Sequence, residues 1–98
     1  MKVVFHPEAG DEFQRAIETY QGESCDLGIR YYRSVFAALV RMQSYPRVWP
    51  RLYGAVRRCF VDEFPYKVYY AIEAEPLLVV AVMHGKRKPD YWVERVVE

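Results

Sequence analysis

Several side chains that could do chemistry lie together in one stretch, AVMHGKRKPDYW, at residues 81–92. An apolar run stops there at His84, an imidazole that could act as an acid or a base near neutral pH. Basic and aromatic side chains follow at once: Lys86, Arg87, Lys88, Tyr91 and Trp92. A strand that ends in this way either runs out into solvent or carries a working surface at its tip. In the first case His84 donates one structural hydrogen bond, the three basic residues form a solvated turn, and Trp92 packs under the sheet.

The composition indicates a folded protein with one domain, residues 1–98. Hydrophobic residues make up 52% of the chain and aromatic residues 16%, too many for a disordered protein. With 14 basic and 13 acidic residues the formal charge is only +1, so the whole molecule has no strong field for nucleic acid. Any basic surface must therefore be local.

The placement of cysteine and histidine predicts neither a metal site nor a disulfide. Cys25 and Cys59 are 34 positions apart and the two histidines are 78 apart, so neither pair has metal-ligand spacing. We expect two free structural thiols, no metal and no cofactor. The chain shows no secretory pattern and no run of about 18 apolar residues, so we predict a cytoplasmic protein without a membrane span.

Two amphipathic helices are predicted in the first half of the chain, after a short strand at residues 2–6. The first helix starts at Pro7, ends near Gly22 and has an apolar face formed by Ala9, Phe13, Ala16, Ile17 and Tyr20. We expect Glu12 and the other charged residues of this helix to lie off that face.

The second helix is expected to run to about Ser44, with Ser24 or Asp26 as its cap. Helical spacing predicts its apolar face: Cys25, Ile29, Tyr32, Phe36, Leu39 and Val40. Residues 45–54 contain two prolines and predict an irregular connection rather than an element.

After Gly54 the apolar period changes to two, which predicts strands within residues 55–64, 66–73 and 77–84 joined by short turns. The last is a nearly continuous apolar run, typical of a central strand covered on both faces. The predicted fold is α+β with the order β-α-α-β-β-β, a small antiparallel meander with two N-terminal helices packed on it.

The two short turns decide which side chains meet. A first turn at residues 63–66 brings Asp62 near Lys67, and a second turn centred near residue 75 brings Lys67 near residues 83–84. One end of the sheet should therefore hold several candidate site residues: Lys67, His84, Lys86, Arg87, Tyr91 and Trp92. Arg57 and Arg58 enter the first meander strand at its other end, roughly 17 Å away.

The motifs FPYKVYY at residues 64–70 and HGKRKPDYW at residues 84–92, with this order of elements, resemble the RelE/ParE superfamily of bacterial toxins. The resemblance covers nearly the whole chain and is sharpest from Arg57 to Arg95. It implies the toxin of a type II toxin–antitoxin module, a class linked to plasmid stabilisation, which inhibits growth and is neutralised in a complex with a cognate antitoxin. RelE-like members sit in the ribosomal A site and help cut mRNA, whereas ParE-like members bind DNA gyrase and are not known as nucleases.

The RelE-like interpretation implies metal-independent RNA cleavage by a few cations and a tyrosine around the scissile phosphate. Carried over by position, the catalytic residues would be Lys67, Arg87 and Tyr91, with Trp92 as the other match for the tyrosine and His84 as a further candidate for proton transfer.

The strand before FPY departs from the RelE-like pattern. Phe60 and Asp62 stand where those enzymes have lysines, and Asp62 and Glu63 would repel a phosphate or pair with Lys67 or Arg87. We therefore favour a ParE-like toxin that inhibits DNA gyrase without nuclease chemistry. Its expected partner-binding residues are Arg57, Arg58, Lys86, Arg87, Trp92 and Arg95. The alternatives are a ribosome-dependent mRNA endonuclease and an inactive toxin fold that only binds.

Overall fold

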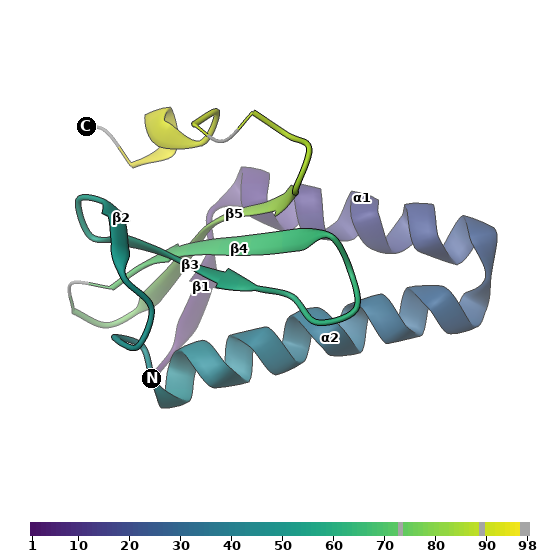
Figure 1. The fold of residues 1–98 in the computed structure, drawn as a ribbon, viewed down its shortest axis with the longest axis horizontal. Coiled ribbons are helices and arrows are strands. Elements are labelled where there is room, and N and C mark those ends of the chain that lie inside the picture. Colours follow the sequence, from purple (N-terminus) through teal and green to yellow (C-terminus); the bar gives the residue numbers. More distant parts are fainter. Residues whose placement is uncertain (73, 89, 97–98) are drawn as a thin grey trace.

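The computed structural model describes residues 1–72, 74–88 and 90–96. Its five-stranded sheet has the order β1-β5-β4-β3-β2, and a helical hairpin lies beside it (Figure 1). The elements are β1 (Val3–Phe5), α1 (Pro7–Glu23), α2 (Cys25–Ser44), β2 (Arg51–Tyr53), β3 (Val56–Phe60), β4 (Tyr66–Ala71), β5 (Leu77–His84) and the 3₁₀ helix η1 (Val93–Arg95). Neighbouring strands are antiparallel except for β1, which is parallel to β5. The predicted α+β fold is confirmed, with one strand more than expected.

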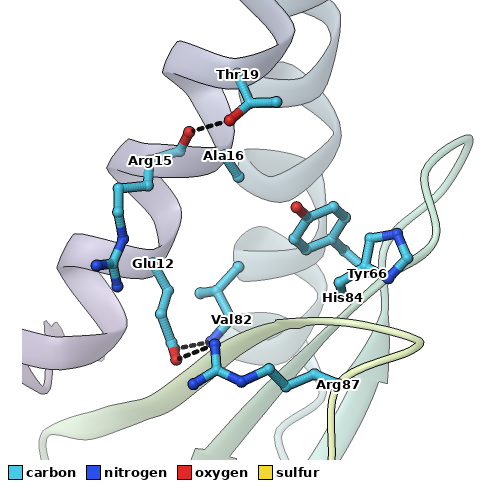
Figure 2. Close-up of a pocket in the computed structure, with 8 residues that line it drawn as sticks. All are labelled: Glu12, Arg15, Ala16, Thr19, Tyr66, Val82, His84 and Arg87. Atoms are coloured by element: carbon cyan, nitrogen blue, oxygen red, sulfur yellow. Dashed lines mark hydrogen bonds and ion pairs between the residues drawn. The ribbon is translucent and has the colours of Figure 1, made fainter.

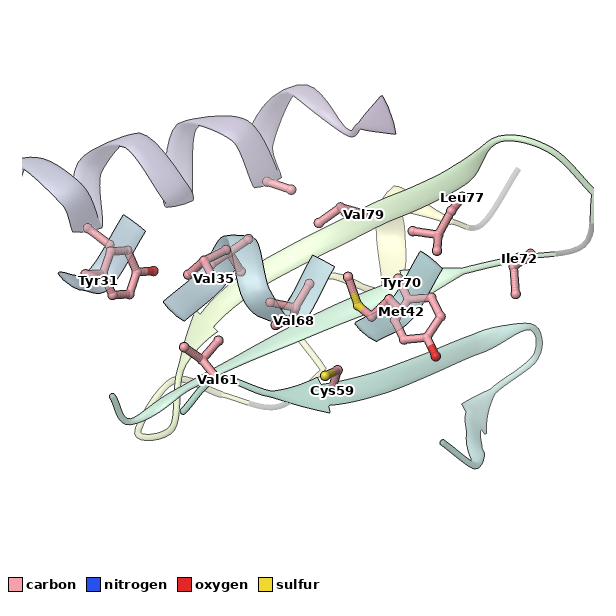
Figure 3. Packing of buried hydrophobic residues seen from close by; sticks show 14 residues of the cluster. Tyr31, Val35, Met42, Cys59, Val61, Val68, Tyr70, Ile72, Leu77 and Val79 are labelled. Atoms are coloured by element: carbon pink, nitrogen blue, oxygen red, sulfur yellow. The ribbon is translucent and has the colours of Figure 1, made fainter. Parts of the chain in front are cut away.

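Both faces of the sheet are covered. The helices pack on one face, where the core of Figure 3 includes Tyr31, Val35, Met42, Cys59, Val68, Tyr70 and Val79. The C-terminal segment packs on the other face, where Trp92 contacts a second apolar cluster that includes Tyr69, Val80 and Met83. Six of the eight residues of β5 are buried, which confirms the prediction of a covered central strand. Cys25 is exposed, Cys59 is buried, and both are free thiols in the described chain.

The chain reverses between the helices at Ser24. Its backbone N–H donates to the carbonyl of Tyr20 at 3.0 Å, which ends α1. Its hydroxyl oxygen accepts a hydrogen bond from the N–H of Leu27 at 3.0 Å, which caps α2. The predicted capping role of Ser24 is confirmed.

The apolar face predicted for α2 is wrong. The buried residues of the helix are Gly28, Tyr31, Val35, Ala38 and Met42. Most of the predicted face is exposed instead, with Ile29, Tyr32, Phe36 and Val40 between 44% and 55% accessible. Both sets have helical spacing, so the period could not separate them. Gly28 favours the observed orientation, because a Cβ at this position would lie 2.6 Å from Cγ and 3.2 Å from Cα of Gln21, so a larger residue would push the helices apart.

A short edge strand, β2, lies within the segment predicted to be irregular. Arg51 pairs with Arg57 of β3, and Tyr53 pairs with Val56 across a tight turn at Gly54, whose φ is +54°. Three residues are too few for an alternating pattern to be recognised in the sequence. The prediction for residues 51–53 is therefore wrong.

The register of the β3–β4 hairpin differs from the prediction by two residues, while that of β4–β5 agrees with it. Phe60, not Asp62, lies opposite Lys67, because the connecting loop is longer than expected and Glu63 adopts a φ of 69° within it. Lys67 lies opposite Met83, as predicted. The end of β5 therefore lies beside the start of β4.

Candidate functional site

The tip of β5 is a tight, internally bonded turn. His84 lies opposite Tyr66, and their rings meet edge-on with centroids 5.2 Å apart. Its Nδ1 accepts a hydrogen bond from the N–H of Lys86 at 3.0 Å, and its carbonyl accepts one from the N–H of Arg87 at 3.0 Å. The turn thus places Arg87 beside α1.

Lys67 does not join this group. Side chains alternate along a strand, and Tyr66 and Val68 lie in the cluster under the helices while Tyr69 lies in the cluster under the C-terminal segment. Lys67 therefore faces the second side of the sheet, and His84 faces the first with Tyr66. Lys67 and His84 do lie at the same end of the sheet, as predicted, but their side chains point to opposite faces of it.

Glu12 of α1 organises the surroundings of Arg87, although we expected it to lie off the buried face. Its side chain is 4% exposed. Arg95 donates to Oε1 and Oε2 at 2.9 Å each, and the hydroxyl of Tyr91 donates to Oε2 at 2.6 Å. The guanidinium of Arg87 lies 3.9 Å from Oε2. A single buried carboxylate thus connects the first helix to the C-terminal segment.

The sheet explains why a carboxylate is buried at this position. β1 ends at Phe5, opposite Val79, whereas β5 continues to His84, so in the described chain no strand covers the last part of this edge. Oε1 of Glu12 accepts from the N–H of Val82 at 3.1 Å, and Arg95 donates to the carbonyl of Val80 at 3.0 Å. The two side chains supply hydrogen bonds that a neighbouring strand would have made.

The contacts in this cluster keep the Glu12 carboxylate ionised and the Tyr91 hydroxyl protonated. Burial alone would raise the pKa of Glu12, but the hydrogen bonds from Arg95, Tyr91 and the Val82 N–H outweigh it and hold the pKa below its ordinary value. Burial and the hydrogen bond to Glu12 raise the pKa of the Tyr91 hydroxyl. Tyr91 is therefore a neutral hydroxyl whose proton is already donated to Glu12.

Tyr91 also fixes the two arginines. The guanidinium carbon of Arg87 lies 3.9 Å from its ring centroid and that of Arg95 lies 4.9 Å from it. The side chain of Arg87 is still 51% exposed, whereas that of Arg95 is 8% exposed. Arg87 is thus held in one place but remains accessible.

A cavity of about 330 Å³ opens between α1 and the end of β5 (Figure 2). Its lining residues are Glu12, Arg15, Ala16, Thr19, Tyr66, Val82, His84 and Arg87. Among the described residues, no three histidine, cysteine or acidic side chains lie close enough to hold a metal ion. In the same residues, no helix is both long and apolar enough to cross a membrane.

The family model described as "ParE toxin of type II toxin-antitoxin system, parDE" matches residues 3–89. The chain belongs to this family. Among solved structures, the "Chromosomal ParDE TA system from P. aeruginosa" is similar in fold, with a TM-score of 0.62 at 10% sequence identity over 86% of this chain and 95% of that chain. Comparison with curated proteins found no match. The RelE/ParE resemblance of the sequence is confirmed, and the protein is a ParE-family toxin of the type II toxin–antitoxin class.

The acidic pair of this ParE-family toxin lies away from Lys67 and Arg87, so the predicted pairing with them is wrong. Asp62 accepts a hydrogen bond from Arg41 at 3.2 Å, and Glu63 lies 3.5 Å from Arg30. Both arginines come from α2, because the β3–β4 loop folds toward that helix. The two carboxylates neutralise the surface of α2 instead of the tip of β5.

The arginine pair of β3 points to opposite sides of the sheet, as expected. Arg57 donates to the backbone carbonyls of Arg47 and Trp49, so it anchors the connection after α2. Arg58 lies over the ring of Phe60, with 4.9 Å between its guanidinium carbon and the ring centroid. Partner contact by the pair stays a prediction, for which Arg58 is the better placed.

Two further predicted partner residues have largely covered side chains in the ParE-family fold. Trp92 is 3% exposed and packs on Tyr69 with ring centroids 5.0 Å apart, which confirms that it covers the sheet. Arg95 is held by Glu12. Partner contact by either residue stays a prediction and would require the C-terminal segment to leave the sheet. Lys86 and Arg87 are exposed and accessible.

Proposed function

We propose that this toxin inhibits bacterial growth by binding DNA gyrase in the cytoplasm, without nuclease chemistry. The observation that carries the proposal is the dispersal of the candidate catalytic groups. Lys67 faces the second side of the sheet, His84 and Arg87 lie beside α1, and the hydroxyl of Tyr91 is bound to Glu12. RNA cleavage would need an acid or base and several cations around one phosphate.

The alternative, a ribosome-dependent mRNA endonuclease, would require a more positively charged surface. An A-site nuclease must hold a polyanion inside a polyanionic particle, which calls for several available cations on one surface. The formal charge here is +1, and two of the arginines of α2 face Asp62 and Glu63. A gyrase inhibitor needs only a patch with one or two accessible arginines and aromatic neighbours, for which Arg87 on Tyr91 is suited.

We further propose that a cognate antitoxin neutralises the protein by covering the exposed face of α2, in a toxin–antitoxin hetero-oligomer. Four rings form a stacked row from α2 across α1 to β1, in the order Phe36, Tyr32, Phe13 and Phe5, with neighbouring centroids 5.9–6.4 Å apart. Ile29 and Val40 extend the apolar face along the helix. An apolar face of this length on a small protein is typical of a binding site.

Charge complementarity favours an acidic amphipathic helix as the occupant of this face. Arg33 follows Tyr32 directly on α2, and its guanidinium makes no ion pair with any described residue. Arg30 and Arg41 lie on the same side of the helix but are paired with Asp26, Glu63 and Asp62, so within the described residues Arg33 is the arginine of α2 left for a partner. A partner helix with one apolar and one acidic side would satisfy both features.

Induction of the protein in a bacterial host tests the proposed mode of action. We expect an SOS response with intact mRNA, because stalled gyrase damages DNA. Codon-register cuts in ribosome-bound mRNA within minutes of induction, lost in Arg87→Ala, would instead establish the endonuclease. Normal growth on induction would support an inactive toxin fold and would contradict both modes of harm.

A further inference from the structure

The cavity between α1 and β5 is lined by more positive charge than its own carboxylate can balance. Glu12 is the one carboxylate among its described lining residues, and Arg95 already neutralises it through two hydrogen bonds of 2.9 Å. Arg15 and Arg87 therefore contribute a surplus of about two positive charges. Their guanidinium groups lie on either side of the Glu12 carboxylate in Figure 2.

Both arginines have donors left for a ligand. The guanidinium of Arg15 makes no hydrogen bond or ion pair with any other described residue. That of Arg87 approaches Glu12 only to 3.9 Å, beyond hydrogen-bond length, and its position is fixed by the ring of Tyr91. A fixed guanidinium with free N–H groups is suited to bidentate binding of an oxyanion.

Further hydrogen-bond donors complete the lining across the opening, where Figure 2 shows Tyr66 and His84. Because Nδ1 of His84 accepts from the N–H of Lys86, the proton of a neutral imidazole lies on Nε2. Burial raises the pKa of the Tyr66 hydroxyl, which therefore remains a donor at neutral pH. Cations and hydrogen-bond donors from α1, β4, β5 and the following turn thus line one cavity.

We propose that this cavity binds a phosphate group, either free phosphate or the terminal phosphate of a nucleotide. A phosphate monoester carries close to two negative charges at neutral pH, which matches the two surplus arginines, whereas a carboxylate carries one. The cavity volume of about 330 Å³ leaves room for such a group. The inference shares Arg87 with the gyrase proposal but rests on the lining of the cavity, and Arg15, on which its test depends, has no part in the gyrase or antitoxin proposals.

Titration of the ¹⁵N-labelled full chain with inorganic phosphate tests the site, with chloride used to keep the ionic strength constant. We expect saturable shifts of the amides of Thr19, Val82 and His84. Arg15→Ala should weaken binding about tenfold or more, because it removes charge-assisted hydrogen bonds. Arg15 is exposed, so this variant should remain folded, and Arg15→Lys should restore part of the affinity. Arg33→Ala is the matched control and should bind phosphate like the parent chain.

Parallel titrations identify the source of the phosphate and its specificity. Tighter binding of adenosine 5′-monophosphate than of inorganic phosphate would assign a nucleotide ligand, and the reverse order would assign free phosphate; both support the site. Acetate should bind much more weakly. Equal binding of acetate, unsaturable shifts spread over the surface, or unchanged affinity in Arg15→Ala would overturn the proposal.

Discussion

Glu12 and Arg95 lie 83 positions apart and form a two-pronged ion pair, with each carboxylate oxygen 2.9 Å from a guanidinium nitrogen. Both side chains are at most 8% exposed. The pair ties the C-terminal segment to the first helix and covers the part of β5 that β1 leaves open. It therefore places Tyr91 and Arg87 at the same time.

Removing the carboxylate should destabilise the protein strongly. Glu12→Ala leaves the largely covered guanidinium of Arg95 with only the exposed Glu8, 3.5 Å from its Nε, as an acidic partner, which costs about 3 kcal/mol or more in the free energy of unfolding. Urea unfolding of both proteins measures the difference. Glu18→Ala, an exposed change on the same helix, should cost less than about 1 kcal/mol. Equal losses in the two variants would show that the ion pair contributes little.

The contribution of Glu12 to stability should depend on pH in one direction. Its pKa is lower in the folded protein than the ordinary value of 4.5. The carboxylate therefore stabilises the fold fully above that value, and this stabilisation is lost as the pH falls below it through the folded pKa. Unfolding experiments from about pH 7 to about pH 3 should show the stability gap between the parent chain and Glu12→Gln shrinking with acidification. A gap that widens on acidification would contradict the direction of the shift.

The variant Tyr91→Phe tests whether the hydroxyl of this tyrosine is structural or catalytic. The variant keeps the ring that holds Arg87 but loses the 2.6 Å hydrogen bond to Glu12, which should cost about 1–2 kcal/mol of stability. Because the hydroxyl has no role in the proposed gyrase inhibition, growth inhibition should persist at temperatures where the variant is folded. Complete loss of inhibition by a folded variant would indicate that the hydroxyl takes part in chemistry.

The exposed face of α2 should matter for the antitoxin and not for folding. Phe36→Ser is expected to change the free energy of unfolding by less than about 0.5 kcal/mol, since the ring is 55% exposed. It should weaken antitoxin binding by about 2 kcal/mol, or roughly thirtyfold in Kd. Calorimetric titration with the cognate antitoxin measures this. Val48→Ser, a change at an exposed residue outside the helix, should bind normally, and equal affinity of both variants would place the antitoxin elsewhere.

Much of the fold could be predicted from the sequence, because it depends on local periods and turns. Pro7 and Ser24 marked the helix starts, and the apolar run at residues 77–84 identified the covered strand. The orientation of α2 could not be predicted in this way, since Tyr31 and Tyr32 both belong to faces with helical spacing. The close approach at Gly28 decides between them, and it is a tertiary contact.

The central residue of the site was missed for a related reason. Glu12 lies between the buried residues Ala9 and Ala16 at spacings of three and four, which places it on their face. A carboxylate at such a position signals a buried polar partner, but the partner, Arg95, is at the far end of the chain. Only the fold, in which β1 stops before β5 does, shows why the carboxylate is needed.

The most direct test of the proposed mode of action is a supercoiling assay with purified DNA gyrase, run beside an mRNA cleavage assay on programmed ribosomes. Gyrase inhibition without nuclease chemistry predicts that the parent chain and Lys67→Ala both block supercoiling and that neither cuts A-site mRNA. Unaffected supercoiling together with codon-register mRNA cleavage that disappears in Lys67→Ala would contradict it.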